Sequence, residues 1–129
     1  MSAGRILGVQ FVAAFLLALL TWIAIWQSLY WRLWWFDIPM HILGGVWAGL
    51  CAAWLTARRE EGFSLLWCLV FTLAIGIGWE LFEYSEGIAF PRYFSYPADT
   101  IKDLVMDLVG GALGWFLATK LLPSHKIKG

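Results

Sequence analysis

Three short segments of this sequence place ionisable side chains at the ends of long hydrophobic runs. They are Asp37–His41, Glu80–Glu83 and Asp103–Asp107. Helical residues three or four apart share a face, so each segment would present two side chains to one centre. An ionisable side chain inside a bilayer is costly and marks a functional site by default. We therefore expect the three segments to meet in one carboxylate–histidine site.

The charge of such a site predicts its chemistry. Carboxylates gathered in a low-dielectric pocket repel one another unless they are protonated, paired with cations or bridged by a metal. The nearby basic residues, Arg92 and Lys102, are too few to neutralise the set, whereas Mg²⁺, Mn²⁺, Ca²⁺ or Zn²⁺ would do so. A carboxylate left free of the metal could serve as a general base. The predicted metal ligands are Asp37, His41, Glu80, Asp103 and Asp107, and the predicted catalytic residues are Glu80 and Glu83.

Simpler roles account for some of these residues. A lone histidine near a helix start is more often a hydrogen-bonded structural residue than a ligand. Acidic residues in the first helical turn favour the helix macrodipole, which partly explains Asp37 and Asp103. Asp99 is expected to cap the fourth helix. The macrodipole does not account for His41, Glu80 and Asp107, which lie deeper than a first helical turn. These three residues are therefore the strongest candidates for a functional role.

The elements that must position these residues are membrane-spanning helices. Hydrophobic residues make up 61% of the 129 residues and charged residues 14%, with a mean hydropathy of +0.73. These values are typical of a small polytopic membrane protein and exclude an ordinary soluble domain. We predict an all-α, four-transmembrane-helix bundle in a single membrane domain covering residues 1–129. The predicted helices span about 6–28, 38–57, 62–84 and 100–122.

The length of the fourth hydrophobic run places two carboxylates inside the membrane. Its uncharged part, Leu108–Thr119, covers only about 18 Å as a helix. The hydrocarbon core of a bilayer is about 30 Å thick. Asp107 and Asp103 must therefore lie in the embedded part of this helix.

The distribution of lysine and arginine predicts the topology, because basic residues concentrate on the cytoplasmic side. The alternating spans put Arg32, Arg92 and Lys102 on one side. The other side has Arg5, Arg58, Arg59, Lys120, Lys126 and Lys128. We therefore predict a bacterial-type inner-membrane protein with both termini cytoplasmic and the carboxylates near the outer face. Tyr30, Trp31, Trp34 and Trp35 fit an aromatic belt at that face.

Two nine-residue segments suggest an internal repeat. Residues 37–45 match residues 103–111 at four positions, and three more are similar aliphatics. This match favours two pseudo-repeated helical hairpins related by an axis along the membrane normal. Any two glycine-bearing membrane helices can also look alike over nine residues. In either case the glycines one turn from His41, Glu80 or Asp107 would let the helices pack closely; they are Gly44, Gly45, Gly76, Gly110 and Gly111.

In order and spacing, these motifs resemble the VanZ-like family of small membrane proteins and the related YjdF-type inner-membrane proteins. The matching features are Asp37-x-x-x-His41, Glu80-x-x-Glu83, Pro91-Arg92 and Asp103-x-x-x-Asp107-x-x-Gly110. The resemblance covers residues 36–115 and implies a four-helix membrane protein, linked in some members to glycopeptide-antibiotic resistance. This chain departs from the family at Ile38, Glu83 and Asp107, where lysine, glutamine and asparagine are frequent. These departures make the site more acidic.

Three functions remain open from the sequence. The first is a divalent-metal site that binds or acts on a lipid-linked or cell-envelope substrate, as in a metal-dependent membrane hydrolase. The second is a non-catalytic accessory subunit of a larger membrane complex, or a homo-oligomer, whose ten tryptophans pack on lipid or protein partners. The third is proton or ion translocation through the embedded carboxylates. A net charge of zero argues against nucleic-acid binding.

Overall fold

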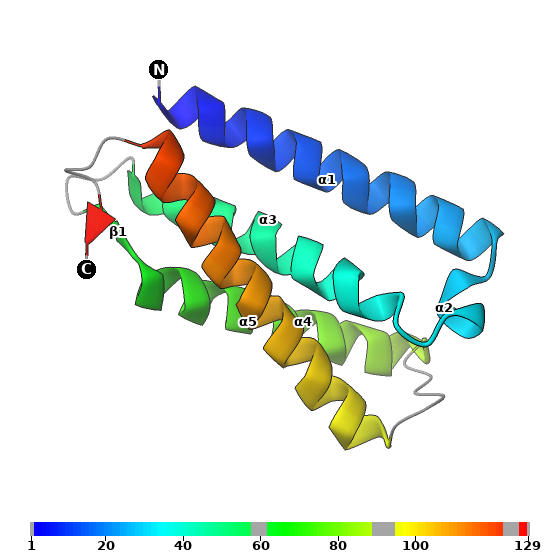
Figure 1. The fold of residues 1–129 in the computed structure, drawn as a ribbon. Helices are drawn as coiled ribbons and strands as arrows, with labels where there is room; N and C mark the ends of the chain where they lie inside the picture. Colours follow the sequence, from blue (N-terminus) through cyan, green and yellow to red (C-terminus); the bar gives the residue numbers. More distant parts are fainter. Residues whose placement is uncertain (1, 58–61, 89–94, 123–126, 129) are drawn as a thin grey trace.

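The structure, a computed structural model, describes residues 2–57, 62–88, 95–122 and 127–128. Its four long helices are α1 (Ser2–Trp26), α3 (Asp37–Ala57), α4 (Leu65–Glu86) and α5 (Tyr96–Leu121) (Figure 1). Each is long and apolar enough to cross a membrane. A one-turn helix, α2 (Leu29–Arg32), joins α1 to α3, and the two-residue strands β1 (Phe63–Ser64) and β2 (Ile127–Lys128) pair in parallel. The predicted all-α architecture with four spans is confirmed.

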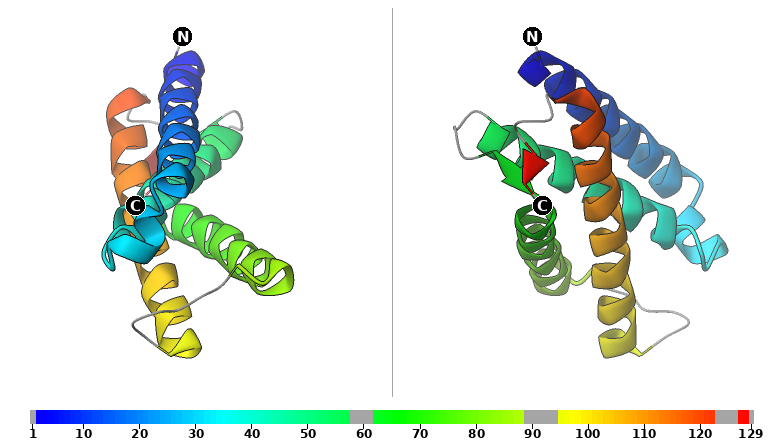
Figure 2. Two further views of the ribbon diagram at one scale, coloured as in Figure 1. Left: turned by 90° about the vertical axis from the view of Figure 1, so that its right-hand side faces the viewer. Right: turned by 60° about the vertical axis from the view of Figure 1, so that its left-hand side comes forward.

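Helix α3 is the centre of the bundle. It packs against α1, α4 and α5, and its most extensive contact is with α5. Helices α3 and α5 run in the same general direction, while α1 and α4 run the opposite way (Figure 1). The end view shows α1 and α4 diverging on different sides of α3 (Figure 2). Side chains of these three helices provide most of the lining of the pocket described below.

Local sequence signals account for the helix ends. Helix α4 begins at Leu65, three residues later than predicted, because the Ser64 side chain accepts a hydrogen bond from the Trp67 backbone N–H. It ends at Gly87, whose φ of 66° is left-handed. Helix α5 begins at Tyr96 rather than near residue 100, with Ser95 as its N-cap and proline in the first turn, where no N–H is needed. The prediction that Asp99 caps this helix is therefore wrong, since Asp99 lies within its first turn.

Glycines bring the backbones of α3 and α5 into direct contact. A Cβ atom on Gly45 would collide with the backbone of Asp107 and Gly110. A Cβ atom on Gly110 would collide with the backbone carbonyl of Ile42. One turn further along, Gly49 meets Gly111 and Gly114 in the same way. The predicted close packing of glycine faces is thus present between these two helices.

This crossing has its own approximate two-fold symmetry. Gly45 lies against Gly110, and Gly49 lies against Gly114, so the paired residues are 65 positions apart. The sequence match between residues 37–45 and 103–111 aligns residues 66 positions apart instead. The contact register therefore differs by one residue from the alignment that suggested a repeat.

The remaining glycines near the site differ in what surrounds them. A Cβ atom on Gly44 would meet nothing within 4 Å, so the prediction that Gly44 packs against another helix is wrong. Gly76 on α4 makes room for the Asp107 carboxylate, and Gly111 makes room for the Thr72 side chain. These two contacts hold α4 against α5.

The two ends of the bundle differ in polarity. The main apolar core, which includes Leu50, Ala53, Phe63 and Cys68, lies toward the end where α3 finishes and α4 starts. The carboxylates lie toward the opposite end, where α3 and α5 start. The basic residues Arg58, Arg59, Arg92 and Lys126 lie outside the described residues, as does the side chain of Lys128.

Candidate metal centre and adjoining pocket

His41, in the second turn of α3, is held between carboxylates on both sides of its ring. Its Nδ1 atom donates a hydrogen bond of 3.0 Å to Asp107 Oδ1. Its Nε2 atom lies 3.5 Å from Asp37 Oδ1 and 3.6 Å from Asp103 Oδ2. The His41 side chain is only 7% exposed, and Asp103 only 3%. The α3–α5 crossing thus gathers three of the predicted site residues, all carboxylates, around the imidazole of a fourth.

Three of these residues have the arrangement of a metal-binding group. One ligand atom from each of Asp37, His41 and Asp103 lies within 4.8 Å of the other two. A single ion could contact all three after small side-chain movements. The other ring nitrogen of His41, Nδ1, is hydrogen-bonded to Asp107. In metal sites, a carboxylate in this position fixes the tautomer and orientation of the metal-binding histidine. We call Asp37, His41 and Asp103 the ligand triad.

Lys102 lies at the edge of the ligand triad, and the sequence predicted it as a nearby cation but not as a site residue. Its Nζ atom lies 2.7 Å from Asp99 Oδ1, 3.1 Å from Asp103 Oδ1 and 3.5 Å from Asp37 Oδ2. One ammonium therefore joins three carboxylates from two helices. The spacing of Asp99 and Lys102, three residues apart, was the available signal for the nearest of these pairs. The contact with Asp37 depends on how α3 and α5 meet.

The two predicted catalytic residues on α4 have different surroundings. Glu80 is 7% exposed and accepts a 3.0 Å hydrogen bond from Thr100 Oγ1. Its other oxygen, Oε1, is buried with no hydrogen-bond partner in the described part of the chain. Glu83 accepts a 2.9 Å hydrogen bond from Trp79 Nε1 and faces a pocket. Glu80 interacts electrostatically with His41, although it does not belong to the ligand triad.

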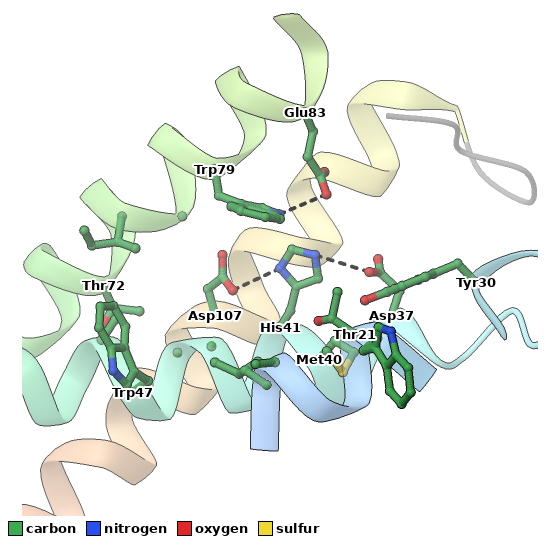
Figure 3. Close-up of a pocket in the computed structure, with 18 of the residues that line it drawn as sticks. Thr21, Tyr30, Asp37, Met40, His41, Trp47, Thr72, Trp79, Glu83 and Asp107 are labelled. Carbon is green, nitrogen blue, oxygen red and sulfur yellow. Dashed lines mark hydrogen bonds and ion pairs between the residues drawn. The ribbon is translucent and has the colours of Figure 1, made fainter. Parts of the chain in front are cut away.

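The pocket adjoins His41 and has a volume of about 620 Å³. Figure 3 shows Trp79 and Glu83 on α4 facing His41, Asp37 and Asp107. Most of its lining is apolar or aromatic and comes from α1, α3 and α4. The ionisable lining residues besides tyrosine are Asp37, His41, Glu83 and Asp107. Pockets of this size and character are typical of small-molecule sites.

Tyr30 of α2 closes one side of the pocket and was predicted only as part of an aromatic belt. Burial, followed by the nearby charge of Asp37, raises the pKa of Tyr30 to about 12, against a hydrogen bond with Thr21 that lowers it. The Tyr30 hydroxyl therefore stays neutral and able to donate at physiological pH. The connection between α1 and α3 thus contributes a polar group to the pocket.

Comparison with known proteins places the chain among membrane proteins. A family described as "Predicted membrane protein (DUF2238)" matches residues 6–123. The match covers α3, α4, α5 and nearly all of α1, and so includes every residue of the ligand triad and the pocket. No curated protein and no solved structure matches the chain.

Proposed function

The chain belongs to this family of membrane proteins, and from that premise we propose that it holds a divalent metal ion and binds or acts on a lipid-linked or cell-envelope substrate. The observation that carries the proposal is the ligand triad, whose three ligand atoms lie within 4.8 Å of one another. Two carboxylates and one imidazole suit Mg²⁺, Mn²⁺ or Zn²⁺. The Asp107 hydrogen bond to the far ring nitrogen supports the same assignment.

The side chains around the triad have distinct proposed roles. A divalent ion held there would supply Lewis acidity toward a carbonyl or phosphoryl oxygen, as in a metal-dependent hydrolase. Asp107 would orient His41 through the far ring nitrogen, because its other oxygen, Oδ2, lies against Gly76 and away from the triad. Glu80 is a candidate ligand through Oε1, the buried oxygen without a hydrogen-bond partner in the described chain. Glu83 faces the pocket, where it could hold a polar group of the substrate or accept a proton from it.

We propose that the site lies near the outer face of a bacterial-type inner membrane, with both termini cytoplasmic. Support comes from the count of basic residues in the sequence, with six on the side of Arg5 and Lys120 and three on the side of Arg32 and Lys102. Trp31, Trp34 and Trp35 are exposed at the site's own end, as in an interfacial aromatic belt. The resemblance to VanZ-like and YjdF-type proteins supports a role at the cell envelope.

The metal content of the purified protein tests the proposal. We expect near-stoichiometric divalent metal in protein purified in detergent without chelators, and its loss in His41→Ala. Elemental analysis by mass spectrometry gives the measurement. The matched control is His125→Ala, which removes the other histidine of the sequence and should retain the metal. Equal metal content in the two variants, or none in the wild type, would contradict the proposed metal centre.

A second candidate function is that of an accessory subunit or homo-oligomer. It is favoured by the stacked, exposed pair Trp22 and Trp26 on α1, which could pack on a partner helix as well as on lipid. This function predicts stoichiometric co-purification with a larger membrane complex, or self-association, in mild detergent. A protein that is monomeric at native expression levels would exclude it.

A further inference from the structure

The pocket beside the ligand triad has the charge of a site for a cation. Its lining includes three carboxylates, those of Asp37, Glu83 and Asp107, and one imidazole. The Lys102 ammonium pairs with Asp99, Asp103 and Asp37 and does not line the pocket. A cationic group entering the pocket would therefore be attracted, whereas an anionic one would meet three carboxylates.

The aromatic residues of the pocket suit the same kind of group. Trp22, Tyr30 and Trp79 all line it, and Trp79 donates its indole N–H to Glu83. Figure 3 shows Trp79 and Glu83 on one side of the space and Tyr30 and Asp37 on the other. Aromatic faces combined with carboxylates are the usual means of recognising ammonium groups. The pocket therefore fits an alkylammonium better than a phosphate.

The rest of the pocket is apolar and runs along the helices. On α4 the lining extends from Glu83 to Thr72, a stretch of twelve residues, whose ends are about 16 Å apart along the helix. That length is roughly half of a hydrocarbon core about 30 Å thick, or one leaflet. The ionisable side chains lie at one end only, and the deeper lining includes Leu17, Ala48 and Ile75. A pocket that is charged at one end and apolar along the rest matches an amphiphile that lies parallel to the surrounding lipids of the bilayer.

The pocket also opens sideways. Trp22 and Ile25 of α1 are 67% and 63% exposed, and Ile75 and Trp79 of α4 are 43% and 49% exposed. All four residues line the pocket, two from α1 and two from α4. Around a membrane-spanning bundle, exposed side chains at this depth face lipid. A molecule could therefore enter from the bilayer without first crossing water.

From these features we propose that the pocket binds a membrane amphiphile with a cationic, amine-type headgroup. The headgroup lies among Glu83, Trp79 and Tyr30, and one hydrocarbon chain lies between α1 and α4. This inference names the class of substrate for the proposed function. It rests on that function because it takes this pocket as the substrate site. The headgroup contacts on α4 are separate from the ligand triad, so the two ideas can fail independently.

Binding of chain-matched probes tests the headgroup. The full-length protein in dodecyl maltoside would be titrated with dodecyltrimethylammonium and with dodecyl phosphate, and bound probe counted by native mass spectrometry. We expect one equivalent of the cationic probe to bind, at least about tenfold more tightly than the phosphate. Glu83→Gln should weaken cation binding roughly tenfold. The control Glu86→Gln, which removes an exposed carboxylate one turn away and outside the pocket, should leave it unchanged.

A pair of α1 variants tests the position of the chain. Ala18 lines the pocket, whereas Ala14, one turn earlier on α1, is exposed and does not. Ala18→Trp should fill the space and abolish binding of the cationic probe, and Ala14→Trp should not. Equal or tighter binding of dodecyl phosphate would overturn the inference, as would unchanged cation binding in Ala18→Trp.

The same samples separate this inference from the metal proposal. His41→Ala should lose the metal and keep the cationic probe, because removing a positive ion does not weaken attraction for a cation. Loss of metal with no preference for the cationic probe in any variant would overturn only the inference. Cation binding in protein that never contains metal would support the inference and overturn the metal centre.

Discussion

Replacing Gly110 with alanine is expected to destabilise the protein by about 3 kcal/mol or more. The added Cβ atom would collide with the Ile42 carbonyl and the Gly45 backbone, and backbone atoms cannot move aside as a side chain does. Helices α3 and α5 would have to separate, which would also pull His41 away from Asp107. Unfolding in mixed detergent micelles measures the loss of stability.

The control for this prediction is Gly78→Ala on α4. A Cβ atom there would meet nothing within 4 Å, and the position is exposed. Alanine favours a helix over glycine by roughly 0.5–1 kcal/mol, so this variant should be as stable as the wild type or slightly more so. Similar stability of the Gly110 and Gly78 variants would contradict the backbone-to-backbone crossing.

In protein stripped of bound metal, replacing Lys102 with methionine is expected to cost about 3–5 kcal/mol of stability. Methionine keeps much of the length and apolar character of the side chain but removes its charge. Asp103, which is 3% exposed, would lose the cation 3.1 Å from its Oδ1 atom, and Asp37 and Asp99 would lose the same partner. The uncompensated buried carboxylate accounts for most of the expected cost. Mixed-micelle unfolding again provides the measurement.

A control variant and the addition of metal test whether the loss of stability in Lys102→Met comes from the unpaired carboxylates. Lys120→Met removes an exposed lysine that lies over the Phe116 ring at the opposite end of α5 and should cost little. Excess Mn²⁺ or Mg²⁺ should restore much of the stability of Lys102→Met, since a divalent ion would again compensate Asp37 and Asp103. The ion should not rescue Gly110→Ala, whose defect is steric. Absence of any rescue of Lys102→Met would argue that these carboxylates do not bind a metal.

The sequence alone determined the four spans and the side chains that share a helix face. The sequence also predicts that Asp103 and Asp107 lie inside the membrane, because the uncharged part of their helix is too short to cross it. The pairs Asp37/His41 and Asp103/Asp107 could be assigned to common faces because helical periodicity is local. The glycine pair that ends each segment also pointed to the contact between α3 and α5, in which Gly45 and Gly110 take part.

Only the tertiary structure decided which faces meet. In the folded protein Lys102 lies against Asp37. Glu80 accepts a hydrogen bond from Thr100, whereas Glu83 faces the pocket. Gly44 has no packing partner within 4 Å. The tertiary structure also set the α3–α5 register one residue away from the sequence match. Each of these features depends on how closely two backbones approach and at what angle. That approach is a property of a pair of helices, and no periodicity within one helix encodes it.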